Sequence, residues 1–258
     1  MSPPFGTSEI DLRRTRWEHH RALMDLTKAT GDKFALGGLA AHSEAPDMRL
    51  VVLPSDPQLH PVPLDDSTAG WLSKSRPSPY DGHQISWGDG WRATSQAFVL
   101  GARWDHAPWR RYLALHRHGG LEAAVAGISW QRRDQGLRVF SLRHIVGLAW
   151  TALDIQAGVA EQWDIDGPWE VTLALRGCRG AVLGGFAEGW QEPDDFRSDH
   201  RVCLEEHALH RWEVDAIEPE VLAEQIGQRT ENTFGSTHRR HLANHGHFDG
   251  KFDPRFGW

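Results

Sequence analysis

The chain is poor in cysteine and contains no long hydrophobic run. Its 258 residues include two cysteines, Cys178 and Cys203, too few for the disulfide framework of a small secreted domain. The first residues contain no apolar segment of the kind that forms a signal peptide, and no later segment is long and apolar enough to span a bilayer. We therefore expect a cytoplasmic protein that has no membrane partner.

Lysine and the familiar catalytic motifs are also scarce. The sequence has no GxxxxGK[ST] phosphate loop, no GxSxG elbow and no HExxH pair, and no dinucleotide-binding fingerprint follows an expected strand. Four of the 28 basic residues are lysines, so a carboxylate–lysine nuclease site is hard to place. These absences argue against the commonest enzyme classes and leave open whether the chain is an enzyme.

Hydrophobic patterning predicts an α+β fold with mixed or antiparallel sheets and two to four main helices. Helices are expected over residues 8–29, over residues 141–163 after a cap at Ser141, and from Pro219 to about Asn232. The expected strands are Arg49–Leu53, Trp91–Leu100, Arg111–His118, Leu121–Ile128, Trp169–Leu175, Ala181–Ala187 and residues 207–215.

A proline-rich stretch divides the chain into two expected parts. Six prolines between Pro54 and Pro79 predict a mostly irregular segment and mark the boundary between lobes. Residues 1–80 then hold the N-terminal helix, a strand and the proline-rich segment. Residues 81–258 form an α+β domain that ends in a tail laid over the surface.

Two segments of the second part resemble each other. RYLALHRHGGLEAAVAG, from Arg111, and EVTLALRGCRGAVLGGFAEG, from Glu170, both predict a hairpin around glycine, and an amphipathic helix follows each at some distance. One explanation is a pair of pseudo-repeated hairpin–helix lobes that close around a shared cleft. The other is a chance match between two hairpins.

Charge is distributed unevenly along the chain. Residues 103–143 carry eight arginines against three carboxylates, and residues 186–224 carry twelve carboxylates against three arginines. Arginine makes bidentate contacts to phosphate and stacks on bases, so a basic block beside tryptophans suits a polyanion. The alternative is a solvated strand face whose charges pair with the acidic block. The candidate ligand-binding residues are Arg110, Arg111, Arg117, Arg132, Arg133, Trp109 and Trp130.

A second group of candidate ligand-binding residues follows the last expected helix. It consists of Thr237, His238, Arg239, Arg240 and His241, whose hydroxyl and guanidinium groups suit an anion site. Basic residues at this position would equally complement the dipole of the helix C-terminus. Both explanations stay open.

Four residues have the chemistry of a zinc site. On a helix, His200, Cys203 and His207 would share one face, and His210 would complete an imidazole and thiolate set. On the strand predicted over residues 207–215, however, His207 and His210 point to opposite faces. We therefore expect no metal and no cofactor, with zinc as the alternative.

Three segments resemble a known family. RYLALHRHGG, GPWEVTLALRGCRGAVLGGFAEGW and TENTFGSTHRRHL resemble the C-terminal regions of large actinobacterial proteins, often labelled ATP-binding, that carry an N-terminal Schlafen-like, Alba-type DNA-binding domain. The resemblance covers about residues 90–258 and carries over no catalytic residue. It implies a role in regulation or in defence against foreign nucleic acid.

These observations predict a non-catalytic binding or regulatory protein that recognises nucleic acid or a nucleotide-like anionic ligand. One alternative is a metal-dependent hydrolase or nuclease that uses the C-terminal histidines and carboxylates. The other is a structural subunit of a hetero-complex, whose acidic and basic blocks pair with a protein partner.

Overall fold

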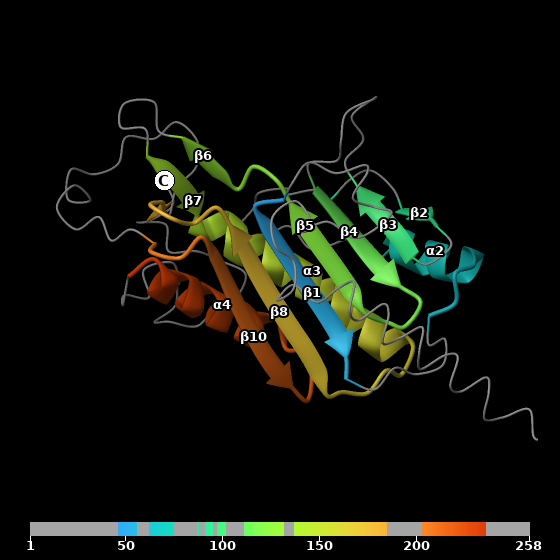
Figure 1. Cartoon of the computed structure of the whole chain (residues 1–258). Coiled ribbons are helices and arrows are strands. Elements are labelled where there is room, and N and C mark those ends of the chain that lie inside the picture. The colour runs from blue at the N-terminus through green and yellow to red at the C-terminus, as the bar shows by residue number, and fades with distance from the viewer. Residues whose placement is uncertain are drawn as a thin grey trace, which may run out of the picture.

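The structure, a computed structural model, describes residues 46–55, 62–74, 87, 91–94, 97–101, 111–131, 137–184 and 203–235. These residues form an α+β fold, as predicted, with a seven-stranded antiparallel sheet, a small mixed sheet of three strands and three helices (Figure 1). No helix among them is long and apolar enough to cross a membrane. The expected helix over residues 8–29 lies outside the described residues.

The large sheet has the strand order β10-β8-β1-β5-β4-β3-β2. Its strands are β1 (Met48–Pro54), β2 (Trp91–Ala93), β3 (Ala97–Gly101), β4 (Arg111–His116), β5 (Leu121–Val125), β8 (Trp169–Arg176) and β10 (His207–Val214). The small sheet has the order β6-β7-β9, with β6 (Ser129–Gln131), β7 (Arg138–Ser141) and β9 (Val182–Gly184). Strand β1 pairs with β5 on one side and β8 on the other, so this strand of the expected N-terminal part lies in the middle of the sheet.

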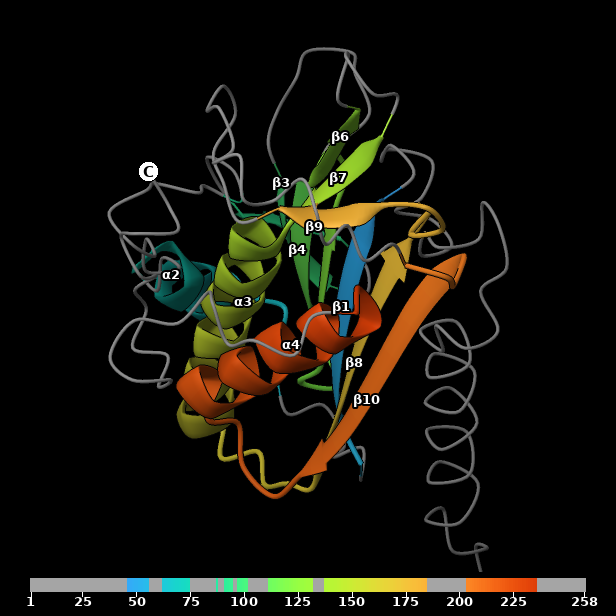
Figure 2. The ribbon, with the colours of Figure 1, turned by 90° about the vertical axis from the view of Figure 1, so that its left-hand side faces the viewer.

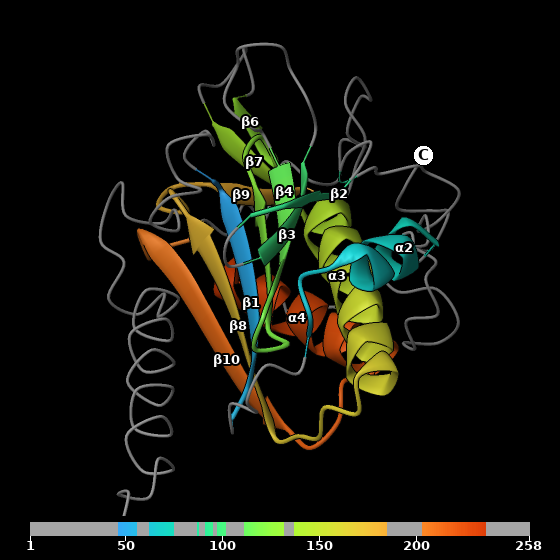
Figure 3. The same cartoon turned by 90° about the vertical axis from the view of Figure 1, so that its right-hand side faces the viewer.

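Two helices lie on one face of the large sheet. Helix α3 (Leu142–Gln162) runs along the sheet and α4 (Pro219–Thr233) crosses it (Figure 2). The side chain of Ser141 accepts a hydrogen bond from the backbone N–H of His144, which confirms the predicted cap, and Pro219 occupies the first turn of α4, as predicted. Helix α2 (Asp66–Lys74) lies beside α3 (Figure 3), where the rings of Trp71 and Trp163 meet edge to face.

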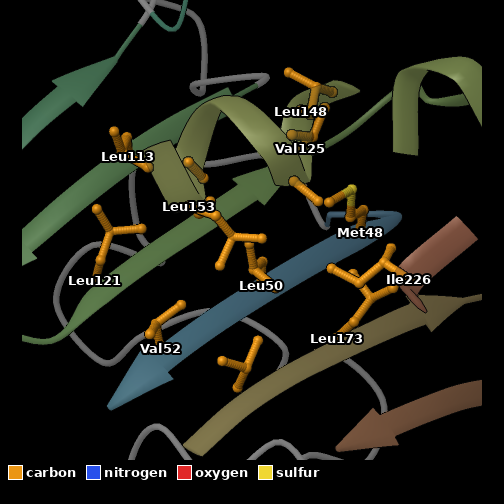
Figure 4. Close-up of a cluster of buried hydrophobic side chains, with 14 of the residues drawn as sticks. Met48, Leu50, Val52, Leu113, Leu121, Val125, Leu148, Leu153, Leu173 and Ile226 are labelled. Atoms are coloured by element: carbon orange, nitrogen blue, oxygen red, sulfur yellow. The ribbon is translucent and has the colours of Figure 1, made fainter. Parts of the chain in front are cut away.

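The core lies between α3 and the sheet. The helix buries Ile145, Leu148, Ala149, Ala152 and Leu153, which recur at helical spacing and form its apolar face. Figure 4 shows Leu148 and Leu153 among aliphatic side chains from β1, β4, β5 and β8. Because every residue of β1 is buried, the sheet is covered on both faces at this strand.

Two elements differ from the prediction near the proline-rich stretch. Helix α2 forms within Pro54–Pro79, which was expected to be mostly irregular. Asp65 begins it, since its carboxylate accepts hydrogen bonds from the backbone N–H groups of Ser67 and Thr68. The hydroxyl of Ser67 donates to the same carboxylate, and this bond, followed by those from the backbone, lowers the pKa of Asp65. The expected strand Trp91–Leu100 is divided into β2 and β3 by a turn.

The second predicted hairpin is wrong. Strand β9 pairs with β7 in the small sheet, in parallel, and not with β8. The physical reason is that both edges of β8 are already paired, one with β1 and the other with β10. The first hairpin, β4 with β5, is confirmed. The similarity between the two segments therefore does not extend to their strand pairing, which favours the chance match over the duplicated lobe.

Candidate functional site

The structure describes three of the residues predicted to bind a ligand. Arg111 begins β4 and Arg117 follows its end, so these two arginines lie at opposite ends of the strand, about 20 Å apart. Trp130 lies in β6, in the other sheet. The remaining candidates lie outside the described residues, and they are Trp109, Arg110, Arg132, Arg133, Thr237, His238, Arg239, Arg240 and His241.

The zinc candidates are distributed around β10. His207 and His210 project from opposite faces of this strand, and the expected alternation of its side chains is confirmed. Cys203 is buried ahead of the strand, and His200 lies outside the described residues. In the described part of the chain, no group of three or more histidine, cysteine, aspartate or glutamate residues could hold a metal ion.

His210 is expected to make the stability of the fold depend on pH. Burial, together with the nearby charge of Arg229, lowers the pKa of His210 to about 4, from an ordinary value of 6.5. Between these values the unfolded chain binds a proton that the folded chain does not, so we expect the free energy of unfolding to fall as the pH drops from 6.5 to 4. Urea denaturation across this range measures the effect. His210→Gln should show a smaller fall, and an unchanged pH dependence would contradict the prediction.

The best candidate site is a set of buried polar side chains on the sheet face opposite α3. The side chains of Arg49 on β1 and Glu122 on β5 have no exposed surface, and Arg49 Nε donates to Glu122 Oε1 over 2.5 Å. The hydroxyl of Tyr112 on β4 donates to the same oxygen over 3.0 Å. His116, at the end of β4, brings Nε2 to 3.8 Å from Glu122 Oε2. We call these four residues the Arg49–Glu122 cluster.

The register of the sheet brings the cluster together. Glu122 pairs directly with Val51 on β1 and with Ala114 on β4. Arg49 and Tyr112 both pair with Ala124, two residues farther along β5, so each reaches Glu122 diagonally. The side chains that directly flank the charged pair are therefore small and apolar.

Glu122 is ionised in the folded protein. Burial alone would raise the pKa of its carboxyl group, but the positive charge of Arg49 and the hydrogen-bonding groups of His116 and Tyr112 outweigh burial and lower it. Arg49 and Glu122 thus form a buried ion pair. Such pairs cost much of their attraction in lost hydration, so stability alone is a weak reason for a fold to contain one.

The two terminal nitrogens of Arg49 distinguish this pair from a closed ion pair. Both Nη1 and Nη2 are buried, and neither has a hydrogen-bond partner among the described residues. A guanidinium group carries five N–H donors, and Glu122 accepts from Nε alone. A buried donor without an acceptor costs about 1–3 kcal/mol, and more when it is charged. Arg49 therefore keeps donors for an acceptor that the described residues do not supply.

A second histidine, His118, adjoins the cluster at the turn between β4 and β5. The rings of His116 and His118 are stacked, with centroids 5.3 Å apart and planes inclined by 7°. The backbone N–H of Gly120 donates to His118 Nδ1 over 3.0 Å. A Cβ atom at Gly120 would lie 2.6 Å from His118 Cε1 and 2.9 Å from Leu53 Cδ2, so this turn requires glycine for close packing.

Gly120→Ala is expected to lower the free energy of unfolding by about 1–3 kcal/mol, because its methyl group would overpack the stacked ring and Leu53. Gly70→Ala is the matched control, since a Cβ at this position in α2 meets nothing within 4 Å. It should raise the free energy of unfolding by about 0.5–1 kcal/mol. Denaturant titration of both variants measures these changes, and a wild-type value for Gly120→Ala would show that the histidine pair is not held rigidly.

Sequence reasoning missed the cluster. Arg49 was assigned only as the first residue of a buried strand, and Glu122 entered only the charge count of residues 103–143. The available signal was one charged residue within each of two otherwise apolar strands, RLVVL and LEAAV. Opposite charges in two buried strands indicate a buried pair. They do not predict the register of the strands, in which Arg49 lies diagonally across from Glu122.

No protein-family model matches this chain, and neither a curated protein nor a solved structure matches it significantly. The resemblance to the C-terminal regions of Schlafen-like, Alba-type proteins therefore stays a prediction. The residues of the Arg49–Glu122 cluster are the structural basis for a function.

Proposed function

We propose that this chain is a binding protein for a small anionic ligand whose carboxylate or phosphate group is held by Arg49. The observation that carries the proposal is the buried guanidinium, anchored through Nε to Glu122, with two terminal nitrogens that no described residue accepts from. Planar N–H pairs of this kind match the two oxygens of a carboxylate or phosphate. Anchoring by Glu122 orients the guanidinium before the ligand arrives, which reduces the entropy lost on binding.

Burial favours a small ligand over a polymer. Arg49 and Glu122 have no exposed surface, so the protein has to enclose whatever group Arg49 contacts. A nucleotide-like molecule or a small carboxylic acid can be enclosed in this way, whereas the backbone of a nucleic acid duplex cannot. Of the predicted ligands, the nucleotide-like anion is therefore the one that the geometry favours.

The proposal is tested by melting the protein with inorganic phosphate, acetate and a nucleoside monophosphate, each over a range of concentrations. A ligand at about 100 times its Kd should stabilise the folded state by about 2.7 kcal/mol. We expect one of the three to do so, and calorimetry to give the affinity. Arg49→Lys should weaken binding about tenfold or more, because lysine keeps the charge and loses the planar pair of donors.

Arg211→Lys is the matched control. Arg211 lies on β10, half-exposed, with its Nε 3.4 Å from Glu170, so its replacement should leave the affinity unchanged. Absence of stabilisation by every anion would contradict the proposal, as would equal affinities in Arg49→Lys and the wild type. Binding to DNA or RNA that weakens steeply with salt, by about one log unit per log salt for each phosphate contact, would instead support the polymer ligand.

A further inference from the structure

The two cysteines of the chain lie together in the core, although the sequence separates them widely. Cys178, in the turn between β8 and β9, and Cys203, ahead of β10, are free thiols with 0% and 1% of their surface exposed. The backbone N–H of Cys203 donates to the carbonyl oxygen of Ala181 over 3.0 Å. The carbonyl oxygen of Cys203 accepts from the backbone N–H of Gly180 over 2.9 Å. Cys178 donates its N–H to Glu206 over 2.9 Å. These backbone bonds join the two segments, and both thiols belong to the same cluster of buried side chains.

We propose that Cys178 and Cys203 are an oxidation site and form a reversible intramolecular disulfide with a small peroxide. Hydrogen peroxide oxidises the Cys203 thiol to a sulfenic acid, and water leaves. The Cys178 sulfur then attacks the Cys203 sulfur, the S–S bond forms and a second water is released. In total the two thiols lose two protons and two electrons, and the peroxide is reduced to two water molecules.

The environments of the two thiols decide their order of reaction. Burial raises the pKa of Cys178 to about 12 and also raises that of Cys203. The rise is the larger for Cys178. Cys203 is therefore the thiol that ionises first. Because both remain mostly protonated, the reaction is slow at neutral pH and accelerates by about tenfold per pH unit.

The disulfide would change how the two sheets are connected. Its two sulfurs belong to the turn that leads into β9 of the small sheet and to the segment that leads into β10 at the edge of the large sheet. A covalent bond at this point joins segments that hydrogen bonds alone now join. The oxidised protein is expected to melt at a higher temperature than the reduced protein, because the cross-link restricts the unfolded chain.

The test is to treat the folded, full-length chain with hydrogen peroxide, block the remaining thiols by alkylation and map the peptides by mass spectrometry. We expect both thiols to disappear together, a linked Cys178–Cys203 peptide two hydrogen atoms lighter than the pair of free peptides, and full recovery with dithiothreitol. Cys178→Ala should instead let Cys203 proceed to sulfinic acid, which dithiothreitol does not reverse.

Peroxide treatment of the chain in denaturant is the control for proximity, and the intramolecular disulfide should form far less there. Independent oxidation of the two thiols to sulfinic acid in the folded protein would overturn the proposal. Disulfides between chains would overturn it too, as would two thiols that stay reduced while the unfolded chain is oxidised. None of these outcomes depends on anion binding at Arg49.

Discussion

Leu153→Ala is expected to lower the free energy of unfolding by about 2–5 kcal/mol. Leu153 lies in the middle of α3, has no exposed surface and points into the aliphatic side chains of the sheet (Figure 4). Removing its branched end forfeits the transfer free energy of the buried carbons and leaves a cavity that a packed helix–sheet interface closes only in part. Urea denaturation followed by far-ultraviolet circular dichroism measures the loss.

Glu161→Gln is the matched control on the same helix. Glu161 is exposed near the C-terminal end of α3, so its replacement should change the free energy of unfolding by less than about 0.5 kcal/mol. Leu153→Met should cost less than about 1.5 kcal/mol, because it conserves the buried volume. Equal losses for Leu153→Ala and Glu161→Gln would mean that α3 does not present this face to the sheet.

Glu122→Met is expected to lower the free energy of unfolding by about 3–5 kcal/mol, because it leaves the charge of Arg49 buried without a counter-ion. Arg49→Met should cost a similar amount for the converse reason. The double variant Arg49→Met/Glu122→Met removes both charges together and should recover most of the loss, since apolar side chains of similar volume replace a buried ion pair at little cost. The resulting double-mutant cycle measures the coupling between the two residues.

The double variant also separates stability from ligand binding. It should fold and melt close to the wild type and yet bind no anion, because the guanidinium has gone. A double variant that still binds the ligand with wild-type affinity would place the binding site elsewhere. A double variant as unstable as either single variant would mean that the pair does not act as a unit.

Acid should weaken the same pair. The pKa of Glu122 is lower in the folded protein than its ordinary value of 4.5, so its ionised form favours folding. This contribution is present above pH 4.5 and is lost as the pH falls through the lower folded pKa. The loss begins at the lower end of the window in which His210 acts and continues below it. Arg49→Met/Glu122→Met should not show it.

Several elements were predictable because their signals are local. The apolar spacing and the Ser141 cap predicted α3, Pro219 predicted the start of α4, and the alternation of apolar and polar residues predicted β10 with its two faces. Each of these signals lies within one element, so no knowledge of the rest of the chain was needed. Helix α2 was missed because the surrounding prolines outweighed a single capping residue, Asp65.

The candidate site was not predictable in the same way. Arg49 and Glu122 are 73 residues apart, and nothing near either residue in the sequence specifies the other. Clusters of charge along the chain are the stronger local signal, because clustered arginines are typical of polyanion surfaces. A single arginine buried in an apolar strand carries no such local signal.

The sequence by itself determined the α+β class, the main helices, most of the strands and which strand residues share a face, because side-chain periodicity follows directly from backbone geometry. Tertiary structure alone decided that β1 lies between β5 and β8, that β9 joins β7, that Arg49 meets Glu122, and that the segments of Cys178 and Cys203 are hydrogen-bonded to each other. Strand order depends on which edges are still free when segments far apart in the chain meet. Those non-local contacts place the charged pair and the thiol pair, and the function proposed here depends on them.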